Sequence, residues 1–155
     1  MNKKGFTLIE LLIVVAIIGI IAAIAIPNLL VALQKGKQKA TMGDLKTIGS
    51  AIESYVTDWS FAPQDDTFVS NNAGAVYFEP FYIKICPKTD GWGNRFLYET
   101  PAGDQYTIYS GGRGPQAAAL TPPTPALYDC TALSDFNNDI AYSNGLFTYG
   151  PVVKR

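Results

Sequence analysis

The sequence predicts an α+β protein in which one long N-terminal helix packs on a small antiparallel β-sheet. Three observations carry this prediction: an apolar stretch near the N terminus, an amphipathic continuation of it, and pairs of short β-prone runs around turn residues. The roughly 100 residues beyond the apolar stretch suffice for one small domain. We therefore expect a helix at 6–33 and a single head at 34–155, which includes the amphipathic half of the helix.

The apolar stretch at 6–33 contains a single charge, Glu10. A helix crosses a bilayer with about 20 apolar residues at 1.5 Å of rise each, so this stretch is long enough to span a membrane. A carboxylate near the end of a membrane helix costs about 1 to 3 kcal/mol unless it reaches the headgroups or finds a partner. Glu10 is therefore either a helix-end acid that reaches the headgroups or a functional group.

Apolar residues continue beyond the membrane-length stretch at spacings of three and four, which is the period of one helix face. They are Met42, Leu45, Ile48, Ile52, Tyr55, Val56 and Trp59. A helix from Phe6 to about Thr57 would be about 78 Å long. Pro27 lies inside it and has no N–H for the carbonyl of Ala23, which predicts a kink or local melting there.

Two pairs of short runs predict the sheet. Asn144-Gly145 stands between β-prone residues within 140–149, which is typical of a tight hairpin. Residues 95–99 and 105–109 form a second pair of strands, joined by a turn-rich connection. Two further segments show no clear period and are predicted to be loops, 61–81 with possible short elements and 110–127 as an irregular surface loop.

The composition argues against an enzyme and against a nucleic-acid partner. The chain has no His, which removes Ser-His and Cys-His dyads and the commonest zinc ligand, and it has no phosphate-binding Gly-Lys-Ser motif. Residues 47–155 carry six basic and eleven acidic side chains, a net charge of −5. An acidic head is a poor match for a phosphate backbone, so no nucleic acid is predicted as a partner.

The residues around Glu10 carry a specific resemblance. The segment KKGFTLIELLIVVAIIGI, from Lys3 to Ile20, strongly resembles the N terminus of type IV pilins and of type II secretion pseudopilins. A secretory signal would instead have a small-residue cleavage site after its apolar core, whereas Gly5 precedes the apolar run. The resemblance implies a pilin-like fold in which residues 1–5 are a leader.

The resemblance also implies a processing and assembly pathway. In this family a prepilin peptidase cuts after the residue that matches Gly5 and methylates the new amine, which here belongs to Phe6. The helix at 6–33 is retained as a membrane anchor and later forms the filament core. The Glu10 carboxylate would meet the Phe6 ammonium of a neighbouring copy, and this pairing would neutralise both charges.

The resemblance further implies partners and a location. The partners are other copies of the chain in a helical filament, prepilin peptidase, an inner-membrane platform protein, an assembly ATPase, and minor pilins or pseudopilins. Lysines flank the apolar stretch on both sides. The excess of basic residues that usually marks the cytoplasmic side therefore does not tell which end of the stretch faces the cytoplasm. The resemblance implies a single-pass protein of the bacterial inner membrane whose head lies outside the cytoplasm.

A second resemblance concerns the kind of filament. Residues 87–98, PKTDGWGNRFLY, look like the Asp-x-Trp-Gly-Asn segment of the major pseudopilin of type II secretion. We interpret Trp92 as a core residue presented by a tight turn and not as part of a ligand site. The segment favours a pseudopilus subunit. The alternatives are a type IV pilus subunit and a membrane-tethered binding or catalytic head that does not polymerise.

Major pseudopilins also tend to bind calcium in a C-terminal loop, and the nearest match here is Asp135, Asn137 and Asp139. These side chains offer the oxygen ligands that Ca²⁺ prefers. The match is incomplete, because the family's Gly-rich acidic run is replaced by residues 110–115, where Arg113 could occupy the place of the cation. The alternative is a set of Asx-turns that prepare the next strand.

The two cysteines, Cys86 and Cys130, both lie beyond the apolar stretch, which agrees with an oxidising compartment. A disulfide between them would close a loop of about 45 residues and stabilise the head by about 3 to 4 kcal/mol in the chain-entropy account. We expect this bond, with two buried thiols as the alternative.

Overall fold

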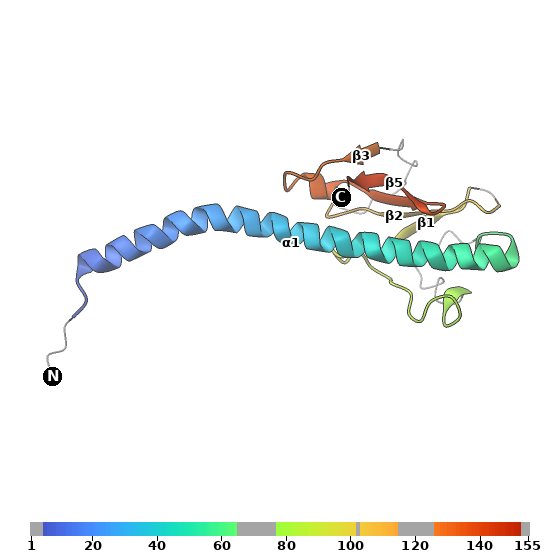
Figure 1. The fold of residues 1–155 in the computed structure, drawn as a ribbon, viewed down its shortest axis with the longest axis horizontal. Helices are drawn as coiled ribbons and strands as arrows, with labels where there is room; N and C mark the ends of the chain where they lie inside the picture. Colours follow the sequence, from blue (N-terminus) through green and yellow to red (C-terminus); the bar gives the residue numbers. More distant parts are fainter. Residues whose placement is uncertain (1–4, 65–76, 102, 115–125, 153–155) are drawn as a thin grey trace.

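The protein is described here by a computed structural model, which covers residues 5–64, 77–101, 103–114 and 126–152. It contains one long helix, five short strands and one 3₁₀ turn. They are α1 (Leu8–Trp59), β1 (Leu97–Glu99), β2 (Thr107–Ser110), β3 (Ala126–Tyr128), η1 (Asp135–Asn137), β4 (Ile140–Ser143) and β5 (Leu146–Pro151). Figure 1 shows that the first half of α1 projects away from the head and that its second half lies along the sheet. The predicted α+β architecture is confirmed.

The long helix α1 has 52 residues and a defined cap at each end. Thr7 is the N-cap, and Ser60 ends the helix in the left-handed conformation with a φ of 63°. At 1.5 Å per residue its length is about 78 Å, as expected for one helix running from the membrane-length stretch into the head. It ends at Trp59, two residues beyond the predicted end.

The helix continues without interruption through Pro27, so the predicted local melting does not occur. It does curve along its blue half in Figure 1, the half that contains the proline. Proline removes one backbone hydrogen bond from the helix, and the turns on either side keep theirs. The side chain of the next residue, Asn28, donates a hydrogen bond to the carbonyl oxygen of Ile24 at 3.1 Å and adds a local bond.

The sheet has the strand order β1-β2-β4-β5-β3. The pairs β1–β2, β2–β4 and β4–β5 are antiparallel, as predicted. The β4–β5 hairpin turns at Asn144 and Gly145, whose φ angles of 44° and 86° suit a tight turn with two left-handed residues. Gly145 is the residue that adopts such a φ without steric cost.

One pairing differs from the predicted antiparallel sheet and makes the sheet mixed: β3 pairs with β5 in parallel, with Ala126 opposite Tyr149 and Tyr128 opposite Pro151. Residue 126, which was predicted to lie in a surface loop, begins this strand. A strand of three residues is too short to show a period of two. β3 pairs with the edge of β5 that faces away from β4, so both edges of β5 have a partner. Residues 65–76 and 115–125 of the two predicted loops lie outside the described residues.

The core lies between the second half of α1 and the sheet. Leu45, Ile48 and Ile52 of α1 are fully buried, and the ring of Tyr142 on β4 lies directly against Gly49, where a side chain would collide with it. The predicted apolar face is therefore largely confirmed. At its ends it differs: Met42 and Val56 are partly buried against the core, and Trp59 is 58% exposed.

Candidate functional site

The projecting half of α1 exposes a continuous apolar surface. Nearly every large apolar side chain from Phe6 to Leu33 is exposed, and this helix is long and apolar enough to cross a membrane by length and composition. A surface of this size is unstable in water unless lipid or protein covers it. The first half of the helix therefore needs an apolar environment that the chain itself does not supply.

The start of α1 brings together the residues predicted to be processed and to act in assembly. Gly5 and Phe6 precede the helix, and Thr7 caps it. The backbone N–H and the hydroxyl of Thr7 donate to Glu10 Oε2 at 2.9 and 2.6 Å, and Glu10 N–H donates to Thr7 Oγ1 at 3.3 Å. This reciprocal capping box gives the single charged group of the apolar stretch hydrogen-bond partners within its own chain.

A buried turn joins the base of the head to α1. Asp90 is 5% exposed, and its Oδ1 accepts hydrogen bonds from the backbone N–H groups of Trp92 at 2.9 Å and Asn94 at 2.8 Å. Its Oδ2 accepts from the Ser110 hydroxyl at 2.7 Å. Trp92 is partly buried against the core and donates through Nε1 to Gln34 of α1 at 2.6 Å. Trp92 is thus an architectural residue, as predicted.

The sequence analysis did not single out Asp90, although it organises this turn. The signal was present, because Asp90-Gly91 stands in a turn-prone segment, and an Asp at the start of a turn typically accepts a hydrogen bond from the backbone N–H two residues on. The neighbouring Gly91 N–H donates to the Thr41 hydroxyl at 2.9 Å, and a Cβ on Gly91 would lie 2.5 Å from the Lys37 carbonyl oxygen. The turn therefore approaches the helix backbone at a distance that only glycine permits.

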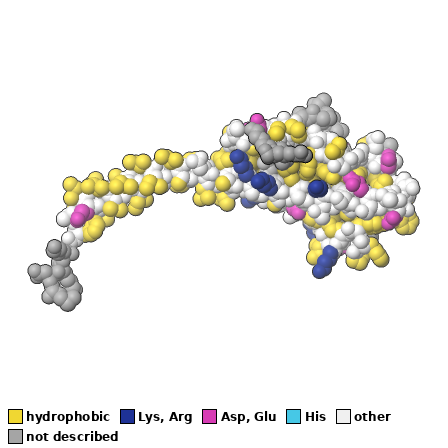
Figure 2. Space-filling model, viewed as in Figure 1, with side chains coloured by type: hydrophobic (Ala, Val, Ile, Leu, Met, Phe, Trp, Pro, Cys, Tyr) yellow, Lys and Arg dark blue, Asp and Glu magenta, His cyan; other side chains and the backbone are white. Residues whose placement is uncertain are grey.

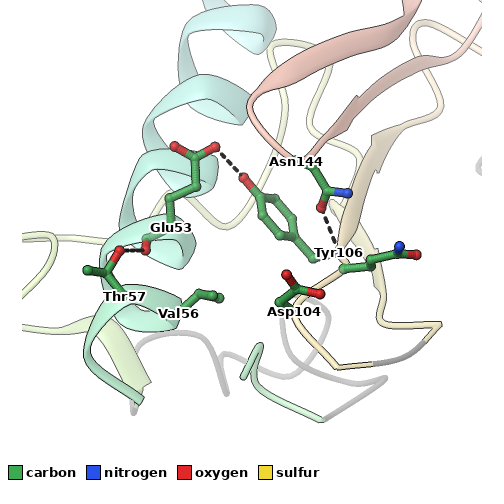
Figure 3. A pocket seen from close by; sticks show the side chains of 7 residues that line it. Glu53, Val56, Thr57, Asp104, Tyr106 and Asn144 are labelled. Carbon is green, nitrogen blue, oxygen red and sulfur yellow. Dashed lines mark hydrogen bonds between the residues drawn. The ribbon is translucent and has the colours of Figure 1, made fainter. Parts of the chain in front are cut away.

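A polar pocket lies at the other end of the head, between α1 and the hairpin (Figure 3). The Tyr106 hydroxyl donates to Glu53 Oε1 at 2.9 Å, and the Tyr106 N–H donates to the Asn144 side chain at 3.0 Å. Burial raises the pKa of Tyr106 far above its ordinary value, so this phenol stays protonated. The Asp104 carboxylate completes the lining. These contacts fasten the hairpin to the helix.

The two cysteines are free thiols, so the predicted disulfide is not present in the structure. Cys86 is buried, and its N–H donates to Glu79 Oε1 at 2.6 Å. Cys130 Sγ accepts a hydrogen bond from Gln38 Nε2 at 3.2 Å. In Figure 1 the yellow-green segment around 80–88 lies on the opposite side of α1 from β3, which Cys130 closely follows. The two cysteines therefore have different partners, Glu79 for Cys86 and Gln38 for Cys130, which their sequence spacing does not reveal.

The residues predicted as calcium ligands do not form a carboxylate cluster. Asp135 Oδ2 accepts hydrogen bonds from the N–H groups of Thr131 at 2.8 Å and Ala132 at 2.7 Å, and these bonds lower the pKa of Asp135. Within the described ranges, no three His, Cys, Asp or Glu side chains gather where they could hold a metal ion. Asp139 is half-buried, which raises its pKa, so its ionised form is disfavoured there.

Arg113 holds the same loop. Its N–H donates to the Phe136 carbonyl oxygen at 2.7 Å, and its Nη1 lies 3.4 Å from the Leu133 carbonyl oxygen. The alternative prediction was a set of Asx-turns that prepare the next strand, β4. Asp135 instead accepts its hydrogen bond from the preceding residue Thr131. Protein donors therefore engage Asp135 Oδ2 and the Phe136 and Leu133 carbonyl oxygens, and the calcium site at Asp135, Asn137 and Asp139 stays a prediction.

Two protein families match this chain. Residues 1–26 match the prokaryotic N-terminal methylation motif, and residues 28–121 match the family described as type II secretion system (T2SS), protein G. The second match covers more than half of the chain. The chain belongs to the type II secretion system protein G family. The predicted resemblance to pseudopilins is confirmed, and this family consists of structural subunits and not of enzymes.

Individual relatives agree with the family. The type II secretion system core protein G of Vibrio cholerae is 39% identical over 114 residues, which cover 69% of this chain and 77% of that protein. The core protein G of Pseudomonas aeruginosa is 30% identical over 124 residues, or 72% and 87% of the two chains. The type IV major pilin PilA of Myxococcus xanthus is 51% identical over 57 residues, or 37% and 26%. No solved structure matches.

Proposed function

We propose that this chain is the repeating structural subunit of a type II secretion pseudopilus, made from a precursor that is cleaved between Gly5 and Phe6. The observation that carries the proposal is the exposed apolar half of α1 with one carboxylate at its start. The methylation motif at residues 1–26 supports processing by a prepilin peptidase, and the protein G match supports the pseudopilus.

The subunit exchanges one apolar environment for another. Before assembly the segment from Phe6 to Leu33 anchors the chain in the bacterial inner membrane, with the head outside the cytoplasm. In the filament the same segment packs among its copies, which bury its apolar surface as lipid does. A platform protein and an assembly ATPase supply the work of extraction, and minor pseudopilins join the same filament. The helical backbone satisfies its own hydrogen bonds in both environments.

Glu10 sets the register of assembly. In the single chain Thr7 donates two hydrogen bonds to Glu10 Oε2. Both donors are uncharged, so they do not neutralise the negative charge of the carboxylate. The ammonium of Phe6 from a neighbouring copy supplies the opposite charge after cleavage. Two opposite charges a few Å apart in an apolar interior attract strongly, and pairing removes the penalty of burying either one alone.

Mass spectrometry of the intact protein from its host tests the processing step. The chain should begin at Phe6 and carry one additional methyl group. Electron microscopy of sheared or overexpressing cells tests polymerisation, and thin filaments containing this chain are expected. A chain that still carries residues 1–5 contradicts the processing proposal. A chain that stays dispersed in the membrane supports instead the alternative of a tethered head that does not polymerise.

A type IV pilus is the second candidate, because PilA of Myxococcus xanthus and PilA4 of Thermus thermophilus also match this chain. Both matches cover less of the chain than the Vibrio cholerae protein G match does. Deletion of the gene distinguishes the two candidates. Loss of exported hydrolases from the medium supports the pseudopilus, whereas loss of surface pili and of pilus retraction supports the type IV pilus.

A further inference from the structure

The two ends of the head carry different charges along α1. At the end where the helix enters the head, the side chains of Lys35, Lys37 and Lys39 are all exposed, and we call them the neck lysines. Figure 2 shows Lys and Arg gathered at this neck and Asp and Glu toward the opposite end, which we call the distal end. Acids occur elsewhere on the head as well, but the two distal pockets are lined by acids and by neither lysine nor arginine.

One of the distal pockets combines aromatic rings with a carboxylate. It has a volume of about 530 Å³ and is lined by Tyr55, Asp58, Trp59, Tyr77, Phe81 and Tyr82. The rings of Tyr55 and Trp59 stack with centroids 6.0 Å apart, and Tyr82 meets Tyr55 edge-on at 5.8 Å. The Tyr82 hydroxyl donates to Asp58 Oδ2 at 2.7 Å, which orients the carboxylate.

This combination suits the end of a lysine side chain. Aromatic faces carry negative electrostatic potential and attract an ammonium group, and the Asp58 carboxylate adds a full negative charge. The Tyr82 hydroxyl donates to Oδ2, and a carboxylate has further lone pairs with which it can accept a hydrogen bond from an amine. The four-carbon stem of lysine would lie against apolar side chains such as Phe81, which is 91% exposed.

We propose that the distal aromatic pocket of one copy receives a neck lysine of a second copy, so that heads stack lengthwise in the filament. This inference rests on the proposed function, because it needs a polymer. Lys37 and Asp58 are 21 residues apart on one helix, which places them about 31 Å apart along its axis. A single chain therefore cannot close this contact on itself.

The contact joins two different surfaces of identical chains. Such head-to-tail contacts generate open helical assemblies when the rotation between copies does not close a ring. The neck lysines and the distal pocket lie at opposite ends of the part of α1 that packs on the head, so each added copy presents a new pocket to the next. The stacking of heads thus supplements the packing of the apolar helix halves and fixes the spacing of the copies.

Zero-length carbodiimide cross-linking of isolated filaments tests the contact. The reagent activates a carboxylate and joins it to an amine held beside it, with formation of an amide bond. Peptide mapping by mass spectrometry should find Asp58 joined to Lys35, Lys37 or Lys39. Because about 31 Å separates these groups within one chain, any such link joins two copies. Detergent-solubilised monomers should not yield it.

Matched variants sharpen the test. Asp58→Asn should abolish the link, and Asp104→Asn, at the neighbouring polar pocket, should leave it. Asp58→Lys should reduce the number of filaments at least tenfold. Combining it with Lys35→Glu, Lys37→Glu and Lys39→Glu should restore them. The melting temperature of each variant in detergent shows whether its head is folded, so that loss of filaments is not misread as loss of folding.

The outcomes separate this inference from the proposed function. Filaments that form normally but yield no link from Asp58 to a neck lysine overturn the stacking contact and leave the pseudopilus proposal intact. Links from the neck lysines to Glu53 or Asp104 alone overturn it as well. A folded chain that makes no filaments under any condition overturns both.

Discussion

The two halves of α1 belong to one continuous helix but bury their apolar side chains in different ways. In the first half, Leu29 is 60% exposed, and most of its apolar neighbours are exposed too. In the second half, Leu45, Ile48 and Ile52 are fully buried against the sheet. The second half obtains its partner from the same chain, whereas the first half depends on lipid or on other copies. Substitutions in the two halves should therefore act on different processes, assembly in the first and folding in the second.

The largest expected effect comes from Glu10 in the first half. Glu10→Ala should leave the protein inserted in the membrane, because replacing a charged side chain by an apolar one favours insertion. It should reduce the number of filaments at least tenfold, because the Phe6 ammonium of the neighbouring copy loses its partner. Filament counts by electron microscopy and membrane fractionation measure the two effects. Asn28→Ala is the matched control, since this polar side chain bonds to its own helix at Ile24. Normal filaments from Glu10→Ala would contradict the assembly role.

The second prediction compares equal truncations in the two halves. Ile48→Ala should lower the free energy of unfolding of the head by about 2 to 5 kcal/mol, because it removes fully buried methyl groups and leaves a cavity. Leu29→Ala should change it by less than about 0.5 kcal/mol, because this residue makes no core contact. Denaturant unfolding in detergent measures both. Equal losses for the two variants would show that the halves fold as one unit.

The third prediction concerns the turn that joins the helix to the sheet. Asp90→Ala should destabilise the head by about 2 to 4 kcal/mol, because it leaves the N–H groups of Trp92 and Asn94 buried without their acceptor. Asp104→Ala, at an exposed acid, is the control and should stay within about 0.5 kcal/mol. Thermal unfolding of the two variants provides the comparison. Similar melting temperatures would contradict the role of Asp90 in stabilising this turn.

The fourth prediction separates the two cysteines. Burial and the nearby Glu79 carboxylate raise the pKa of Cys86 to about 11, so this group remains a protonated thiol at neutral pH. Cys130 is more exposed. With an alkylating reagent and no reductant, both thiols should react, and Cys86 should react at least tenfold more slowly, as followed by mass spectrometry. A pair of peptides joined through the two sulfurs would show that the disulfide forms in the cell.

The smallest expected effect is that of calcium on the head. Because Asp135 is engaged by the N–H groups of Thr131 and Ala132, excess calcium and a chelator should give melting temperatures within about 1 °C. Arg113 contacts this loop through its side chain at the Leu133 carbonyl oxygen. Arg113→Ala should therefore lower the melting temperature. A calcium-dependent increase of several degrees would mean that the loop rearranges to bind the ion.

The sequence predicted those features that local patterns determine. The helix was predictable because its apolar spacing continues at three and four residues up to Tyr55, and the hairpin because Asn144-Gly145 suits a tight turn. The residues at the processing and assembly site were predictable from a motif that lies within one segment. Features that need distant segments to meet were not, namely the parallel pairing of β3 with β5 and the contact of Cys130 with Gln38 of α1. The hydrogen bonds of Asp135 to Thr131 and Ala132 are local, but the residue types alone do not tell whether Asp accepts from preceding or following N–H groups.

The outer strands of the sheet, β1 and β3, have only three residues each. A strand that short offers few unpaired backbone groups, which discourages another chain from adding to the sheet through its backbone. A protein made to associate with many copies of itself thereby avoids the cross-β route to aggregation. Growth is thereby directed to contacts between side chains and not to the backbone edges of the sheet.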